Sequence, residues 1–292
     1  MKLSIHSLIL RLACMGVFDW MDDERYLRLM YWGRMRKRLN LDPPETFNEK
    51  IQWLKLHDRK PEYAKMVDKH EAKKYAADII GSQYIIPTLQ LWNDPSDIDF
   101  DSLPEKFVLK CTHDSGGLVI CEDKSRLDRE AALRKINKSF KKDYYKYSRE
   151  WPYSLVKPRV IAEPLIETEN GGELRDYKFF CFGGKIEMIL VCSDRFSDKG
   201  LCEDFFSAQW EHLDLRRPKH PNFGGNIAKP EQLDEMKEIV KKLAKDMPFA
   251  RIDLYNTAGR IYFGEITLFP AGGFEPFVPR EWDHKLGQMI NI

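Results

Sequence analysis

Apolar residues along the chain follow two spacings, which predict where the helices and the strands lie. Apolar positions three and four residues apart are typical of helices, and the segments with helical character are 26–32, 47–56, 63–79, 125–147 and 231–246. Short apolar runs bounded by turn residues are typical of strands, and these runs are 84–89, 107–111, 118–121, 160–166, 177–182 and 186–192. Residues 200–230 are rich in Pro, Gly and Asn and are expected to be irregular. The mixture predicts an α+β fold.

The order of these elements divides the chain into three parts. Residues 1–60 are predicted to form a helical N-terminal segment, in which Thr46 and Glu49 have the spacing of a capping box. A smaller α+β lobe is expected over residues 61–160, and a larger one over residues 161–292.

The segment 250–267, ARIDLYNTAGRIYFGEIT, predicts a hairpin with a polar face. Residues 257–259 suit a three-residue loop, because its last position is left-handed and glycine adopts that conformation without strain. This register pairs Arg251 with Glu265 and makes Asp253 a diagonal neighbour of Glu265, about 7–8 Å away at the backbone. The side chains on this face are then Arg251, Asp253, Glu265 and Thr267. A four-residue loop would place the two carboxylates on opposite faces.

Two carboxylates on one strand face suit Mg²⁺, which prefers oxygen ligands and is usually held by one or two carboxylates together with substrate phosphates. The alternative is a solvated strand face with an ion pair between Arg251 and Glu265.

Composition excludes several classes of protein. The 292 residues carry a net charge of +1, so nothing global indicates nucleic acid or an anionic membrane as a partner. None of the six cysteines forms a CxxC pair, and the chain has no GxSxG or HExxH motif, which argues against a structural zinc site and against serine or zinc hydrolases. The DxD motifs within 97–101 resemble those of metal-dependent glycosyltransferases, but they follow Pro95 in a loop and are interpreted as turn residues.

The N-terminal residues 1–18 are apolar but are interrupted by His6 and Arg11, so no run reaches the roughly 18–20 residues that span a bilayer. An amphipathic helix that packs on its own domain is expected, with peripheral contact to a membrane or a partner as the alternative. No convincing export signal is present, which predicts a cytoplasmic protein. The basic run 33–40, GRMRKRLN, is interpreted as a solvated helix face, with phosphate binding as the alternative.

Lys110 lies at the end of a predicted strand, immediately before the glycine-containing turn 112–117, THDSGG. A lysine beside such a turn can hold a phosphate as a point charge while turn amides donate to its oxygens. The motif is not a Walker A loop, and an exposed lysine in a plain hairpin is the alternative. His113 is a candidate general base.

Two further segments carry candidate ligands for a nucleotide. Residues 160–167 contain Glu163 followed by a proline, which gives up a ladder hydrogen bond and leaves backbone groups free to contact a purine. Residues 173–178, ELRDYK, place charged side chains on both faces of a predicted strand.

Together these segments resemble the TupA-like ATP-grasp family of bacterial surface-polysaccharide gene clusters. The resemblance covers about residues 20–290, and its most specific stretches are 45–59, 68–75, 107–117, 176–185 and 251–273. Members of the family are often labelled glycosyltransferases or linked to teichuronopeptide synthesis. The resemblance implies an ATP-grasp fold, in which two α+β lobes sandwich ATP.

The resemblance also implies a role for each candidate residue. The residues expected to contact ATP are Lys69, Lys110, His113, Ser115, Gly116, Gly117, Glu163, Leu165, Glu173 and Asp176. One or two Mg²⁺ ions are expected on Asp253, Glu265 and Thr267. Arg251 is expected to stabilise the transferring phosphoryl group, with Lys178 and Arg195 facing a phosphate or the substrate carboxylate.

Two features depart from the family's pattern. ATP-grasp enzymes usually carry an asparagine two residues after the metal-binding glutamate, whereas this chain has Thr267. A hydroxyl can still bind Mg²⁺, so altered metal binding is expected rather than its loss. The α/β domain that usually precedes the ATP-binding lobes is shortened to a helical segment, which leaves the site for the acid substrate poorly defined.

The activity that the resemblance implies is ADP-forming ligation of a carboxylate to an amine through an acyl phosphate. The family setting points to a uronic acid or an acidic amino acid as the carboxylate, on a small molecule or a glycan, and to an amino acid or amino alcohol as the amine. The alternatives are a kinase of a sugar hydroxyl, a glycosyltransferase, and a non-catalytic ATP-binding protein in which Thr267 has disabled metal binding.

Overall fold

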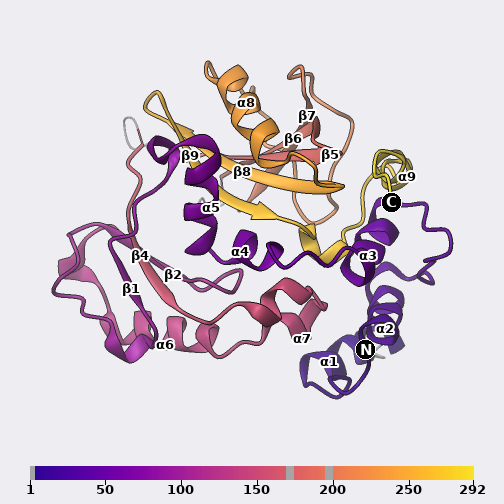
Figure 1. The fold of residues 1–292 in the computed structure, drawn as a ribbon, viewed down its shortest axis with the longest axis horizontal. Helices are drawn as coiled ribbons and strands as arrows, with labels where there is room; N and C mark the ends of the chain where they lie inside the picture. The colour runs from indigo at the N-terminus through magenta and orange to yellow at the C-terminus, as the bar shows by residue number, and fades with distance from the viewer. Residues whose placement is uncertain (1–3, 169–173, 195–199) are drawn as a thin grey trace.

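The computed structural model describes residues 4–168, 174–194 and 200–292, in which two antiparallel sheets lie side by side (Figure 1). The four-stranded sheet has the order β1-β4-β2-β3, and its strands are β1 (Gln90–Trp92), β2 (Phe107–Cys111), β3 (Leu118–Cys121) and β4 (Val160–Pro164). The five-stranded sheet has the order β7-β6-β5-β8-β9, and its strands are β5 (Asp176–Phe182), β6 (Lys185–Ser193), β7 (Cys202–Ser207), β8 (Phe249–Thr257) and β9 (Arg260–Thr267).

Helices surround the two sheets. Those of the N-terminal part are α1 (Ile5–Cys14), α2 (Asp23–Met35), α3 (Phe47–His57), α4 (Tyr63–Val67) and α5 (Glu71–Ile80), and those further along are α6 (Arg129–Phe140), α7 (Tyr144–Ser148), α8 (Leu233–Leu243) and α9 (Glu281–Gln288). The capping box expected at the start of α3 is present, with Thr46 and Glu49 bonding each other's backbone amides. In the described ranges, no helix is both long enough and apolar enough to cross a bilayer.

The N-terminal amphipathic helix expected from the sequence is α1. Its Leu10 and Ala13 pack against a small core that includes Tyr26, Leu27 and Met30 of α2. Packing on its own domain is therefore confirmed for one face of this helix.

Two predicted helices are each divided in the structure. The segment expected as one helix over 63–79 is α4 and α5, because Asp68 breaks the run and its carboxylate accepts the amides of His70 and Glu71. The segment expected as one helix over 125–147 is α6 and α7, where Asp143 caps the second helix.

The strand prediction was wrong at two places. The strand expected at 84–89 lies at Gln90–Trp92, after a short 3₁₀ turn at Ser82–Tyr84. The region expected to be irregular contains β7, where Phe205 and Phe206 are both buried. Apolar side chains on both faces of an edge strand obscure the alternation by which a half-buried strand is recognised.

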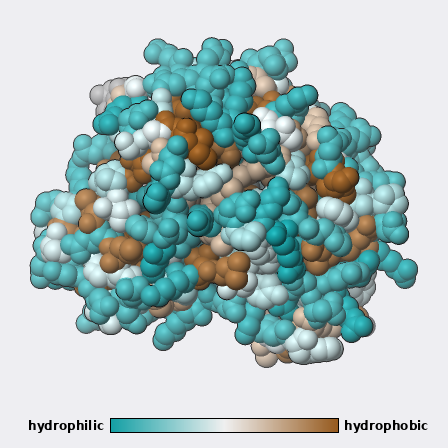
Figure 2. All heavy atoms as spheres, in the orientation of Figure 1, coloured by the Kyte–Doolittle hydropathy of each residue, from teal (hydrophilic) through white to brown (hydrophobic). Residues whose placement is uncertain are grey.

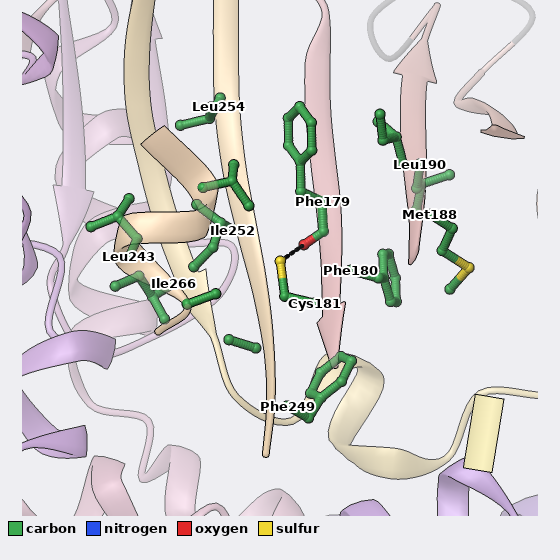
Figure 3. Packing of buried hydrophobic residues seen from close by; sticks show 14 of the residues in the cluster. Phe179, Phe180, Cys181, Met188, Leu190, Leu243, Phe249, Ile252, Leu254 and Ile266 are labelled. Carbon is green, nitrogen blue, oxygen red and sulfur yellow. Dashed lines mark hydrogen bonds between the residues drawn. The ribbon is translucent and has the colours of Figure 1, made fainter. Parts of the chain in front are cut away.

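One face of the five-stranded sheet is covered by α8, and this packing forms the main core of the molecule. Leu243 of α8 lies over Ile252 and Ile266 of neighbouring strands, as Figure 3 shows, and all three are almost fully buried. The molecular surface seen in Figure 2 is predominantly polar, with apolar side chains in small groups. The apolar core leaves the opposite face of the same strands available for charged residues, because strand side chains alternate.

Candidate active site

The hairpin that carries the candidate metal ligands has a different register from the one predicted. Its loop has two residues, Ala258 and Gly259, both with positive φ (50° and 65°), and Thr257 pairs with Arg260. Such primed turns match the twist of a hairpin better than other two-residue loops. The prediction of a three-residue loop was wrong.

A bulge restores the polar face that the shorter loop alone would have lost. The register shifts between Asp253 and Leu254, with Gly264 as the extra residue of β9, so that Asp253 lies directly opposite Glu265. Without the extra residue, Asp253 would face Gly264, and the two carboxylates would project to opposite sides. With the bulge, Arg251 pairs with Thr267, and these four side chains share one face, as expected.

Arg251 forms a clamp between the two carboxylates. Its Nε lies 2.7 Å from Asp253 Oδ1, and its Nη2 lies 2.7 Å from Asp253 Oδ2 and 2.9 Å from Glu265 Oε1. Thr267 Oγ1 donates to Glu265 Oε1 at 3.2 Å. The ion pair between Arg251 and Glu265 therefore exists, and it forms part of a buried network rather than of a solvated strand face.

The network continues on the neighbouring strand β5. Lys178 is opposite Asp253 in the sheet, and its Nζ contacts Asp253 Oδ2 and lies 2.6 Å from Asp176 Oδ2. Burial opposes the charge of Lys178, but Asp176 and Asp253 raise its pKa to about 12. Burial likewise opposes the charges of Arg251 and Glu265, yet their partners raise the pKa of Arg251 and lower that of Glu265 to about 2. These groups are therefore charged at neutral pH.

The four-stranded sheet contributes a second charged group. Glu163 on β4 is buried, and its carboxylate lies 2.6 Å from Lys110 Nζ and 2.5 Å from Lys73 Nζ. Two lysines on one carboxylate leave a net positive charge at this position. Lys73 was missed by the sequence analysis, although it follows Lys69 by four residues within the specific stretch 68–75.

A cavity of about 130 Å³ lies between the two sheets and brings these groups together. Lys110 and Glu163 line it from the four-stranded sheet, and Asp176 and Tyr255 line it from the five-stranded sheet. Leu165, in the connection that follows β4, forms part of its wall. The cavity thus joins Lys110, Glu163, Leu165 and Asp176, all of which were expected to contact ATP.

Hydrogen bonds of Asp114 hold the turn 112–117 in place, and the sequence analysis did not single out this residue. Its carboxylate accepts the Gly117 amide at 3.1 Å and the hydroxyl of Ser139 on α6, and its carbonyl accepts Lys69 Nζ. Ser115 and Gly116 are exposed at the tip of the turn.

His113 points away from the tip. Its ring is buried with its edge against the Phe140 ring, at a centroid distance of 5.9 Å, and burial lowers its pKa. The ring therefore supports the turn from within. Two other predicted residues, Glu173 and Arg195, lie outside the described residues.

A buried lysine holds the turn that follows β9. Lys55 Nζ donates to Gly272 O at 2.6 Å and to Ser148 O at 2.8 Å, and so ties the 3₁₀ turn Pro270–Gly273 to α3 and α7. Lys55 was not a candidate in the sequence analysis, because its partners are backbone atoms that lie near it only in the folded chain.

The donor set fits Mg²⁺. Asp253, Glu265 and Thr267 present oxygen atoms on one strand face, and the Glu265 side chain is 43% exposed, so a cation can approach its carboxylate from solvent. No cluster of three or more His, Cys, Asp or Glu suited to a metal ion occurs within the described ranges, so substrate phosphates would have to supply further ligands.

Comparison with known proteins identifies the family of this chain. The family model described as TupA-like ATPgrasp matches residues 49–291, and the chain belongs to this family and has the ATP-grasp fold. No curated protein matches the chain significantly.

Solved structures with a similar fold include three ligases. The D-alanine-D-alanine ligase from Helicobacter pylori is 18% identical, with 84% of this chain and 69% of that chain covered and a TM-score of 0.44. The D-alanine--D-alanine ligase from Bacillus anthracis complexed with ATP is 14% identical, with 99% and 93% covered and a TM-score of 0.46. The ATP-grasp ligase PsnB complexed with a minimal precursor is 15% identical, with 71% and 53% covered and a TM-score of 0.40, so this chain spans about half of its length.

Proposed function

We propose that this protein is an ATP-dependent, ADP-forming ligase that joins a carboxylate to an amine. The observation that carries the proposal is the clamp of Arg251 between Asp253 and Glu265, on the sheet face whose Asp176 shares a cavity with Lys110. Family membership supports the same class of reaction.

ATP is proposed to bind between the sheets. The adenine occupies the cavity beside Leu165, and the Asp176 carboxylate accepts hydrogen bonds from the ribose hydroxyls. Lys110 is 23% exposed and can leave Glu163 for a phosphate, because Lys73 remains to neutralise that carboxylate. Ser115 and Gly116 cover the phosphates with the amides of the turn, and Gly117 supports the turn through its hydrogen bond to Asp114.

Asp253, Glu265 and Thr267 are the residues proposed to hold Mg²⁺. When bound, the ion neutralises charge on the phosphate oxygens. Arg251 is held rigidly by its two carboxylates, so its guanidinium is already oriented toward the developing charge and no reorganisation is required during the reaction. Lys178 stays protonated and keeps Asp253 in position.

The proposed chemistry has two steps. A carboxylate oxygen of the substrate attacks the γ-phosphorus, and the bond from that phosphorus to the bridging oxygen of ADP breaks, which gives an acyl phosphate. The amine nitrogen then attacks the carbonyl carbon, the carbon–oxygen bond to phosphate breaks, and the amine proton is released with inorganic phosphate. Positioning and charge stabilisation account for most of the rate enhancement in such phosphoryl transfers.

The family's setting motivates the choice of substrates. We propose that the carboxylate is a uronic acid or an acidic amino acid belonging to a cell-surface polysaccharide or its precursor, and that the amine is an amino acid or an amino alcohol. The reaction then takes place on the cytoplasmic side, before the polymer is exported.

The test is an assay of the purified protein with ATP, Mg²⁺ and a panel of such acids, with hydroxylamine in place of the amine. A ligase yields ADP, phosphate and a hydroxamate, and all three depend on the acid. A stable phosphorylated sugar without hydroxamate would indicate a kinase, and transfer from a nucleotide sugar without ATP consumption would indicate a glycosyltransferase.

A further inference from the structure

A second hollow, of about 490 Å³, lies where the end of α2 meets the start of α9. Four basic side chains line it, Arg36 and Lys37 after α2 together with Arg280 and His284 at α9. Its walls include apolar side chains such as Met35 and Phe277. The basic run 33–40 interpreted from the sequence as a solvated helix face therefore contributes two residues to a concave surface.

The positive charge of this hollow is only partly neutralised. Asp283 is the acidic residue in its lining, and Lys37 Nζ lies 3.4 Å from Asp283 Oδ2. The other oxygen of Asp283 accepts hydrogen bonds from the backbone N–H of Asn48 at 3.0 Å and from Asn48 Nδ2 at 2.8 Å. This carboxylate therefore helps to hold α3 against α9. Within the described part of the chain, Arg36 and Arg280 have no ion-pair partner. The hollow thus has two exposed arginines available to an anion.

Arg36 adopts a backbone conformation that a side chain disfavours. It ends α2 with φ 61° and ψ 20°, the left-handed position that glycine usually fills at the end of a helix. The left-handed conformation costs roughly 1 kcal/mol for an ordinary residue. The chain therefore keeps an arginine where glycine would be more stable, and the conformation places the side chain at the hollow.

A buried ion-pair network adjoins the hollow. Pro218 and Pro276 line it, and the residues before them, Arg217 and Glu275, form an ion pair at 3.5 Å. Arg217 also donates to the Glu203 carboxylate on β7 from Nε and Nη2.

Electrostatics indicate how near this network lies to the clamp. Burial opposes the charge of Arg217, but the carboxylates of Glu203 and Glu275 raise its pKa. Arg251 lowers the pKa of Arg217, so the two guanidinium groups are near enough for their charges to interact. The hollow therefore lies one residue along the chain from Arg217, a guanidinium whose charge interacts with that of Arg251.

We propose that the hollow lined by Arg36, Lys37, Arg280 and His284 binds an oxyanion group of the acceptor substrate, a phosphate or a second carboxylate remote from the carboxyl group that reacts. The assignment of this anion to the acceptor rests on the proposed ligase function, whereas anion binding itself rests on the geometry of the hollow. Arginine side chains bind the oxygens of both groups with bidentate hydrogen bonds.

The experiment is a calorimetric titration of the full chain with inorganic pyrophosphate and, separately, with tricarballylate. The variants are Arg36→Gly, Arg280→Gln and the control Asp246→Gly, in which another exposed residue with positive φ (60°) is replaced far from the basic run in sequence. We expect saturable binding of at least one probe, weakened about tenfold in each arginine variant, equivalent to 1.4 kcal/mol, and unchanged in the control. The probe that binds identifies phosphate or carboxylate as the group recognised.

A thermal melt separates lost binding from lost folding. Arg36→Gly relieves the left-handed strain, so its melting temperature should equal or exceed that of the wild type while its anion affinity falls. Lys110→Gln weakens phosphate binding in the nucleotide cavity. In a protein that carries Lys110→Gln, the substitution Arg36→Gly should still weaken binding of the probe. Failure of both probes to bind saturably, or equal affinity in the arginine variants and the wild type, would overturn the proposal. Neither outcome depends on ATP turnover, so failure of the ligase function is recognised separately by the hydroxamate assay.

Discussion

Individual residues of the clamp differ in what they do for stability and for chemistry. The Asp253 side chain is 3% exposed and touches two cations, whereas the Glu265 side chain is 43% exposed. Both carboxylates are proposed Mg²⁺ ligands, but only Asp253 is required to neutralise buried charges. The two positions should therefore respond differently to removal of one charge.

We expect Glu265→Gln to lower turnover about a hundredfold or more, since it removes a ligand charge that neutralises the phosphates, at nearly unchanged stability. Asp253→Asn should lower turnover similarly and should also lower the free energy of unfolding by about 3–5 kcal/mol, because it leaves buried cations without a partner. Turnover as a function of Mg²⁺ concentration and urea unfolding measure the two effects. Near-normal rates in both variants at limiting Mg²⁺ would favour a purely structural ion-pair network.

Thr267 is the residue at which this chain departs from the usual ATP-grasp pattern. We expect Thr267→Asn to preserve or raise turnover, because an amide oxygen replaces a hydroxyl as the third proposed ligand. The apparent Mg²⁺ affinity should rise in the same assay. Inactivation with intact folding would show that the threonine hydroxyl, which donates to Glu265, has a different role.

Glu163 should make stability depend on pH in the acidic range. Burial by itself raises the pKa of this carboxyl, but Lys110 and Lys73 overcome that effect and lower it below its ordinary value. The unfolded chain then binds the proton more readily than the folded one, so the stabilisation is present above about pH 4.5 and is lost as pH falls toward the folded pKa. Unfolding measured between neutral pH and pH 3 should show a shallower decline for Glu163→Gln than for the wild type, and equal slopes would refute this assignment.

At the scale of elements, the hairpin of β8 and β9 depends on a compensation between its loop and its bulge. The two-residue loop shifts the register by one residue and the extra Gly264 shifts it back, so the carboxylates share a face for a reason that alternation alone does not reveal. A Cβ at Gly264 would lie 3.0 Å from the carbonyl oxygen of Asp253. This glycine therefore keeps the bulge compact directly beside the clamp.

We expect Gly264→Ala to lower the free energy of unfolding by about 1–3 kcal/mol, the usual cost of overpacking, and to lower turnover by displacing Asp253 relative to Glu265. Gly259→Asn is the matched control at the loop, where the space is open and asparagine tolerates positive φ. Chemical denaturation and turnover of the two variants provide the comparison. A Gly264→Ala protein as active and stable as the control would show that the bulge is unimportant.

The same scale shows which features the sequence could predict. Helix α3 and strands β2 and β3 were predictable, because local spacing and capping determine them. Lys73, Asp114 and Lys55 could not be assigned, because their partners on β4, α6 and the turn after β9 are distant in sequence. The shared face of Asp253 and Glu265 was predicted through a register that proved wrong.

The whole molecule places two independently built charged groups against each other. The two sheets lie side by side (Figure 1). The four-stranded sheet supplies Glu163 and Lys110, helix α5 supplies Lys73, and the five-stranded sheet supplies the clamp. One cavity has walls from both sheets. Substrates bound between two sheets are shielded from water, which would protect the acyl phosphate of the proposed reaction.

The measurement that tests this account most directly is acid-dependent hydroxamate formation in the presence of ATP, Mg²⁺ and hydroxylamine, with wild type and Glu265→Gln compared side by side. The account predicts one ADP per hydroxamate in the wild type, only when a suitable carboxylate is present, and loss of both products in the variant. ATP consumption that yields a stable phosphorylated sugar and no hydroxamate, at the same rate in both proteins, would contradict it.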